Sequence, residues 1–92
     1  RVDEVTGADI DAQGHRLAVL TYHRIFVFDV RQRPIRFGDP IASLALMQSE
    51  TQQVEAIAWS GDTLIVLNEQ GRLWQIPEGI WNEPAAIFPE EL

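Results

Sequence analysis

The chain has 92 residues, of which 46% are hydrophobic, and 14 acidic against 7 basic residues give it a formal net charge of −7. This composition is typical of a globular domain and excludes a disordered one. The negative charge argues against a nucleic-acid partner, because neutralising phosphates requires clustered Lys and Arg.

Residue content excludes two further classes. The chain has no Cys, so it can form neither disulfides nor a Cys-ligated metal site. No apolar run approaches the ~20 residues of a membrane-spanning helix, and we therefore expect no membrane span.

The first half of the chain contains three segments of strand length separated by turns. Residues 5–11 begin the series, and residues 16–22 and 25–30 follow as runs of β-branched and large apolar side chains. Gly14, which tolerates positive φ, lies in the first turn, and His23-Arg24 forms the second. Because the second and third segments are apolar at nearly every position, both of their faces are expected to be covered.

The middle of the chain is less regular. Prolines interrupt the pattern at Pro34 and Pro40. In the run 41–47 the Ala, Leu and Met residues favour a helix, whereas its short length and the preceding proline favour an outer strand. We predict a strand, because the repeat described below requires a fourth one here, and a polar loop over residues 48–53.

Three more strand-length runs make up the second half of the chain. They span residues 54–59, 63–67 and 72–76. Residues 60–62 and 68–71 separate them and have the composition of turns. The proline-rich tail has room for one more strand at residues 85–88.

The two halves align as an internal repeat with an offset of 47 to 48 residues. The first strands align at 48, the second at 47 after one deletion in the first turn, and the third at 48 again. The aligned pairs are Ala8/Ala56, Leu17/Leu64, Val19/Val66, Leu20/Leu67, Ile25/Leu73, Phe26/Trp74 and Phe28/Ile76. A period of roughly 40–50 residues with several strands per unit is typical of propeller blades.

The repeat predicts an all-β fold of two consecutive four-stranded antiparallel β-propeller blades, residues 1–47 and 48–92. A four-stranded blade cannot cover its own two faces, so neighbouring blades must pack on it, which explains strands that are apolar on both sides. The alternative is a single small β-sandwich or meander whose halves are alike by chance.

The same segments resemble a known group of proteins. Residues 5–10 and 16–22 resemble a blade opening of bacterial β-propeller proteins, and residues 53–59, 61–69 and 71–76 resemble the following blade. The pattern is similar to that of the phytase-like, esterase-like and NHL-type six-bladed propellers. This resemblance favours a bacterial periplasmic or extracellular location over a cytoplasmic one, but it says little about activity, because similar blades carry hydrolases and inert binding domains.

Two blades cannot close a propeller ring. We therefore expect the remaining blades in a longer chain, or identical copies of this chain that assemble into a ring. Three two-blade chains would supply six blades, as cyclic symmetry allows. In either arrangement the blade edges require partner strands.

Acidic residues in the first strand of each blade are the candidate metal ligands. In a propeller these strands line the central channel, and Asp9, Asp11 and Glu55 lie in or beside them. Resemblance to calcium-dependent phytase-like propellers makes Glu55 a candidate oxygen ligand, because calcium requires several converging oxygens. The alternative roles are a polar channel wall or a carboxylate that caps backbone N–H groups.

The remaining side chains offer no catalytic constellation. No Gly-x-Ser-x-Gly elbow is present, and His15 and His23 lie in predicted turns. Trp81 lies outside the repeat and is a candidate ligand-binding aromatic, although packing would also account for it. The sequence thus supports a non-catalytic propeller segment that acts as a scaffold or binding module. The alternative is part of a calcium-dependent phytase-like or lactonase-like hydrolase, with Glu55 and Asp9 among the ligands.

Overall fold

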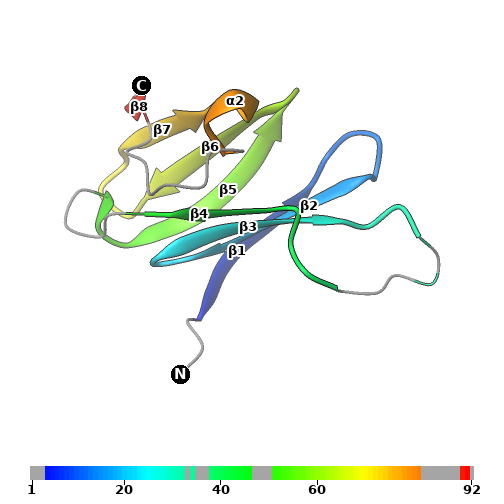
Figure 1. Cartoon of the computed structure of the whole chain (residues 1–92). Helices are drawn as coiled ribbons and strands as arrows, with labels where there is room; N and C mark the ends of the chain where they lie inside the picture. Colours follow the sequence, from blue (N-terminus) through cyan, green and yellow to red (C-terminus); the bar gives the residue numbers. More distant parts are fainter. Residues whose placement is uncertain (1–3, 33, 35–37, 47–50, 82–89, 92) are drawn as a thin grey trace.

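The chain folds into two four-stranded antiparallel sheets that pack against each other (Figure 1). The structure is a computed structural model and describes residues 4–32, 34, 38–46, 51–81, 90 and 91. Sheet A contains, in spatial order, β1 (Val5–Ile10), β2 (Arg16–Thr21), β3 (Arg24–Asp29) and β4 (Ala42–Ala45). Sheet B contains β5 (Val54–Ser60), β6 (Thr63–Asn68), β7 (Leu73–Ile76) and β8 (Glu90–Glu91).

The predicted all-β fold class is confirmed, and the ambiguous run in the middle of the chain is the outer strand β4. The short helix α2 (Glu78–Trp81) follows β7, where the sequence predicted only the end of the strand series. The predicted strand at residues 85–88 lies outside the described residues. The division into residues 1–47 and 48–92 stays a prediction. No helix among the described residues is long and apolar enough to cross a membrane.

The second and third strands of the two sheets have the same register. Leu17 pairs with Phe28 in sheet A as Leu64 pairs with Ile76 in sheet B, which agrees with the predicted offsets of 47 and 48. Both first strands also contain an irregularity near their start, between Val5 and Gly7 and between Val54 and Ala56.

The predicted alignment of the first strands is wrong by one residue. Gly7 lies opposite Leu20, and Ala56 lies opposite Leu67. Since Leu20 and Leu67 are equivalent positions, the residue equivalent to Ala56 is Gly7 and not Ala8. The first turn of sheet A is therefore two residues longer than that of sheet B, where the sequence alignment required only one. Ala8 and Ala56 are both alanines in strands, and this identity does not determine how long the adjacent turn is.

The core lies between the two sheets and is formed by one face of each, here called the inner face. The hydrophobic cluster contains, from sheet A and the residue after β4, Ala18, Leu20, Ile25, Val27, Leu44 and Leu46, and from sheet B, Val54, Ile57, Leu64, Val66 and Ile76. Burying a large aliphatic side chain fully contributes about 1.5–3 kcal/mol, so this interface dominates the stability of the pair. β1 lies against β5, and a Cβ at Gly7 would lie 3.4 Å from the Cα of Ala56. Gly7 thus allows the two first strands to approach closely.

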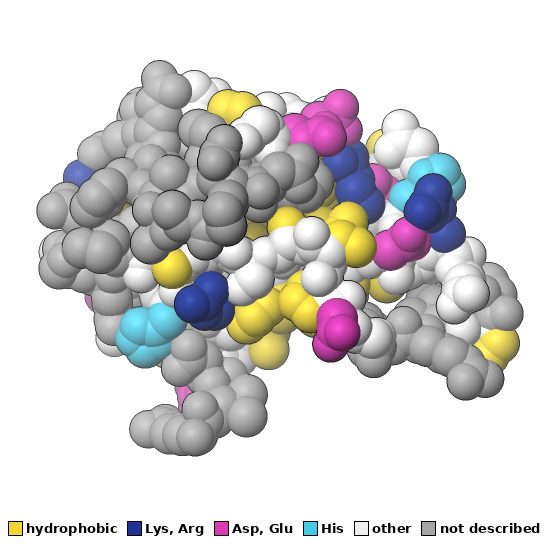
Figure 2. Space-filling model, in the orientation of Figure 1, with side chains coloured by type: hydrophobic (Ala, Val, Ile, Leu, Met, Phe, Trp, Pro, Cys, Tyr) yellow, Lys and Arg dark blue, Asp and Glu magenta, His cyan; other side chains and the backbone are white. Residues whose placement is uncertain are grey.

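The opposite, outer faces of both sheets are largely apolar but only partly covered. Outer face A consists of Ile10, Leu17, Val19, Phe26 and Phe28, and outer face B consists of Ile65, Leu67, Leu73 and Gln75. Ile10 is 45% exposed, and Leu67 and Leu73 are 37% and 38% exposed. Figure 2 shows hydrophobic side chains at the surface in the middle of the molecule, in the region of β3 and β4. The two inner faces cover each other, and the coverage of the outer faces by neighbouring blades stays a prediction.

Candidate functional site

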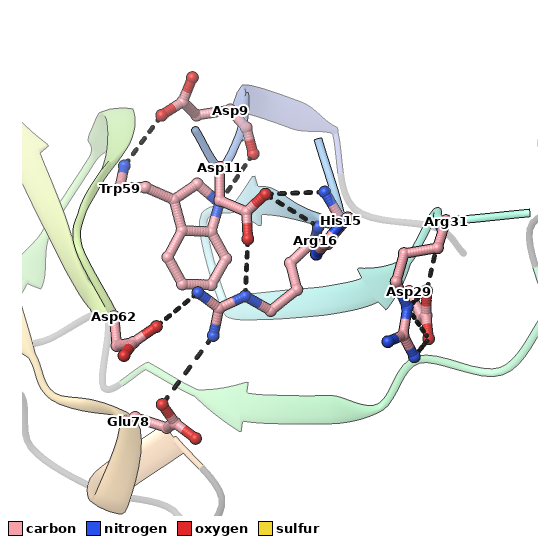
Figure 3. Close-up of polar contacts among 9 residues, drawn as sticks. All are labelled: Asp9, Asp11, His15, Arg16, Asp29, Arg31, Trp59, Asp62 and Glu78. Carbon is pink, nitrogen blue, oxygen red and sulfur yellow. Dashed lines mark hydrogen bonds and ion pairs between the residues drawn. The ribbon is translucent and has the colours of Figure 1, made fainter. Parts of the chain in front are cut away.

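Charged side chains from both sheets meet around Arg16, the first residue of β2 (Figure 3). Arg16 Nε lies 2.8 Å from Asp11 Oδ2, and Arg16 Nη2 lies 2.7 Å from Asp62 Oδ1 in the first turn of sheet B. Its Nη1 is 3.9 Å from Glu78 Oε2 at the start of α2. The guanidinium also lies over the indole of Trp59, 4.4 Å from the ring centroid. We call this group of residues the Arg16 junction; it joins the ends of the two sheets.

Asp11 holds Arg16 in place from the turn between β1 and β2. Asp11 Oδ1 accepts hydrogen bonds from the backbone N–H groups of His15 and Arg16, at 2.8 and 3.2 Å. The carboxylate is almost fully buried. Burial raises the pKa of Asp11, but the hydrogen bonds from the Arg16 side chain and from the two backbone N–H groups outweigh this effect and lower the pKa below its ordinary value. Asp11 is therefore a turn-shaping carboxylate that remains charged.

A second tie between the sheets runs from Trp59 to Asp9. The backbone N–H of Trp59 donates to Asp9 Oδ2 at 2.8 Å, and the indole Nε1 donates to the Asp9 backbone carbonyl at 3.1 Å. Asp9 belongs to β1 and Trp59 to β5. The two hydrogen bonds hold the indole in the position where Arg16 stacks on it.

An open pocket of about 340 Å³ adjoins the junction. It is lined by Asp11, Gln13, His15, Arg16, Asp29, Arg31, Ile41 and Asp62. On its far side Arg31 forms an ion pair with Asp29, and hydrogen bonds from the Arg31 side chain and backbone lower the pKa of Asp29 to about 2. The lining offers both carboxylates and guanidinium groups, and these form ion pairs with each other.

The structure does not bring the three predicted metal ligands to one point. Asp9 and Asp11 bind backbone N–H groups and Arg16, whereas Glu55 is exposed at the irregularity of β5. In the part of the chain that the structure describes, no three His or acidic side chains form a group that could hold a metal ion. Calcium binding by these residues stays a prediction. Trp81 lies in α2, and its side chain is outside the described residues.

No motif in the sequence indicates the Arg16 junction. Arg16 and Asp62 are 46 residues apart, and neither belongs to a recognisable motif. Both residues lie at the turn between the first and second strands of their repeat. Only this shared position could have suggested that they meet.

The architecture matches a solved structure. The crystal structure of BamB from Moraxella catarrhalis, a β-propeller protein, superposes on 97% of this chain with a TM-score of 0.53 and 20% sequence identity. The chain has the fold of a β-propeller fragment. It spans 23% of the length of that protein. No protein-family model and no curated protein matches the sequence.

Proposed function

We propose that this chain is a non-catalytic propeller segment that serves as a scaffold or binding module. The observation that carries the proposal is the way the Arg16 junction uses its charges. Arg16 forms ion pairs with Asp11 in sheet A and with Asp62 in sheet B, and it stacks on Trp59. Hydrogen-bonded charges at such a joint fix the relative position of two packed sheets, which is what a scaffold requires.

The runner-up function is part of a calcium-dependent hydrolase of the phytase-like or lactonase-like kind. Calcium takes six to eight oxygen ligands. Asp9 and Asp11 already accept hydrogen bonds that hold β1, Trp59 and Arg16 together, and a calcium ion would compete with these donors for the carboxylates. The exposed Glu55 is the candidate ligand with an accessible carboxylate, so this position decides between the two functions.

A calcium titration followed by thermal unfolding separates the two functions. A ligand that binds only the folded state raises the melting midpoint, by an amount equivalent to about 2.7 kcal/mol when its concentration is 100 times Kd. We expect no rise at millimolar calcium relative to magnesium at equal ionic strength. A rise that is specific to calcium and absent in Glu55→Gln would reject the scaffold proposal in favour of the hydrolase.

A further inference from the structure

The two sheets of this chain pack through faces that are different from each other. Sheet A contributes the residues around Ala18 and Leu20, and sheet B contributes those around Leu64 and Val66. The strand register shows that the outer face of each sheet corresponds to the inner face of the other sheet. Leu17 and Val19 in outer face A correspond to Leu64 and Val66, and Ile65 and Leu67 in outer face B correspond to Ala18 and Leu20.

Each sheet therefore has two different faces, one like the inner face of sheet A and one like the inner face of sheet B. Within the chain, one face of each type is buried in the contact between the sheets. Outer face A corresponds in register to the inner face of sheet B, the face that packs on sheet A. Its third-strand residues Phe26 and Phe28 correspond to Trp74 and Ile76 of sheet B. Outer face B is of the complementary kind and contains the exposed side chains of Leu67 and Leu73. The two partly covered faces are thus complementary in the same sense as the two faces that already pack together.

We propose that outer face B of a second copy of this chain docks on outer face A of the first. The contact continues the existing interface between the sheets, with Leu67 and Leu73 of one copy facing Val19 and Phe26 of the other. It is heterologous, so it propagates from copy to copy and forms a closed ring if the rotation between copies permits. The inference rests on the proposed function, because it treats both sheets as blades of one propeller.

Charge predicts how this association depends on salt. Each copy has a formal charge of −7, so two copies repel each other, while the proposed contact itself is apolar. Added salt screens the repulsion and leaves the burial of Leu67 and Leu73 in place. We therefore expect association to become stronger between 0.05 and roughly 0.5 M NaCl, the opposite of the response of a contact made by ion pairs.

The test is sedimentation of the chain and of two variants, each with one damaged face. Ile10→Lys damages outer face A, and Leu67→Lys damages outer face B; both side chains are more than a third exposed, so the fold should tolerate the change. Burying an unpaired Lys in an apolar contact is strongly unfavourable. The wild type should associate with rising concentration, and each variant alone should sediment as a single chain. Gln13→Lys, an exposed change of equal charge outside both faces, should associate as the wild type does.

Mixing the two variants is the decisive measurement. Leu67→Lys keeps outer face A and Ile10→Lys keeps outer face B, so an equimolar mixture should form a 1:1 dimer and nothing larger. Leu73→Lys replaces Leu67→Lys should the latter not fold. A monomeric wild type, or a Leu67→Lys chain that still associates with itself, overturns the proposal. A folded monomer without calcium binding would leave the scaffold function standing, so the two proposals fail separately.

Discussion

Sheets A and B share the same strand order and register but differ in the turns that connect their strands. At the end of the second strand each sheet buries one polar residue, Thr21 in sheet A and Asn68 in sheet B, at corresponding positions. Thr21 Oγ1 accepts hydrogen bonds from the backbone N–H groups of His23 and Arg24 across a two-residue turn. Asn68 Oδ1 accepts from Gln70 and Arg72 across a four-residue turn. The apolar register determines the strands, and a buried polar side chain of the right length determines each turn.

The faces of the two sheets differ in the same way. Leu20 and Leu67 occupy corresponding positions in the second strands, yet Leu20 is fully buried against the other sheet and Leu67 is 37% exposed. The same residue type at the same position therefore has two environments. The difference is that another sheet covers the side chain of Leu20 and not that of Leu67. Comparing the two positions therefore measures how much the covering sheet contributes to stability.

The largest effect should come from truncating this pair. Leu20→Ala leaves a cavity in the interface between the sheets, and such substitutions cost about 2–5 kcal/mol. Leu67→Ala removes a side chain that is partly in water, so we expect a loss below about 1 kcal/mol. Denaturant unfolding at a concentration where the chain is monomeric gives both values, provided that the m-value is unchanged. Equal losses would mean that sheet B is covered on both faces and would remove the distinction between inner and outer faces.

The two turn anchors should give the next largest effect. Asn68 also donates from Nδ2 to the Thr51 carbonyl, at 3.1 Å, and so ties the turn to the segment that enters sheet B. Asn68→Ala leaves the carbonyl of the buried Thr51 without this partner, and a buried unsatisfied group costs about 1–3 kcal/mol. The amides of the exposed Gln70 and Arg72 also lose their acceptor but can turn to water. Thr21→Val should cost less, about 1 kcal/mol, because the exposed His23 and Arg24 backbone can turn to water.

Hydrogen exchange tests the same comparison locally. The amides of Gln70 and Arg72 should exchange faster in Asn68→Ala, while the amides of sheet A keep their protection. A larger loss of stability in Thr21→Val than in Asn68→Ala would show that turn length, and not the number of bonded backbone groups, determines the importance of the anchor.

Much of the frame could be predicted from the sequence, and the site could not. Alternating runs and turn residues locate the strands, because strand and turn chemistry is local. The sequence alignment of the first strands is wrong by one residue, because Gly7 and Ala8 both fit the strand pattern. The extra turn residues of sheet A are polar or small and do not show where the strand ends. The place of Asp9 in the first strand makes it a candidate metal ligand, which stays a prediction. Its hydrogen bond to the Trp59 backbone depends on how the sheets pack, and no spacing in the sequence reveals that packing.

Acid should distinguish the first turns of the two sheets, with the smallest effect of the three. Sheet A anchors this turn with the buried Asp11, whereas the corresponding position in sheet B is Ser60, which does not titrate. Because the pKa of Asp11 is lower in the folded state than the ordinary value near 3.9, its charged form stabilises the fold above that value. This stabilisation is lost as the pH falls below about 4 toward the folded-state pKa.

The measurement is the melting midpoint from pH 7 down to about 2.5 for the wild type and Asp11→Asn. Asp11→Asn should melt lower at neutral pH, since the amide cannot replace the carboxylate beside Arg16, and the two curves should converge in acid. Asp29→Asn is the matched control, because that carboxyl also pairs with an arginine but is exposed, and added salt should reduce its effect. Parallel curves for the wild type and Asp11→Asn would mean that Asp11 acts through shape alone, as Thr21 and Asn68 do, and that the charge of the Arg16 junction adds nothing to the joint between the sheets.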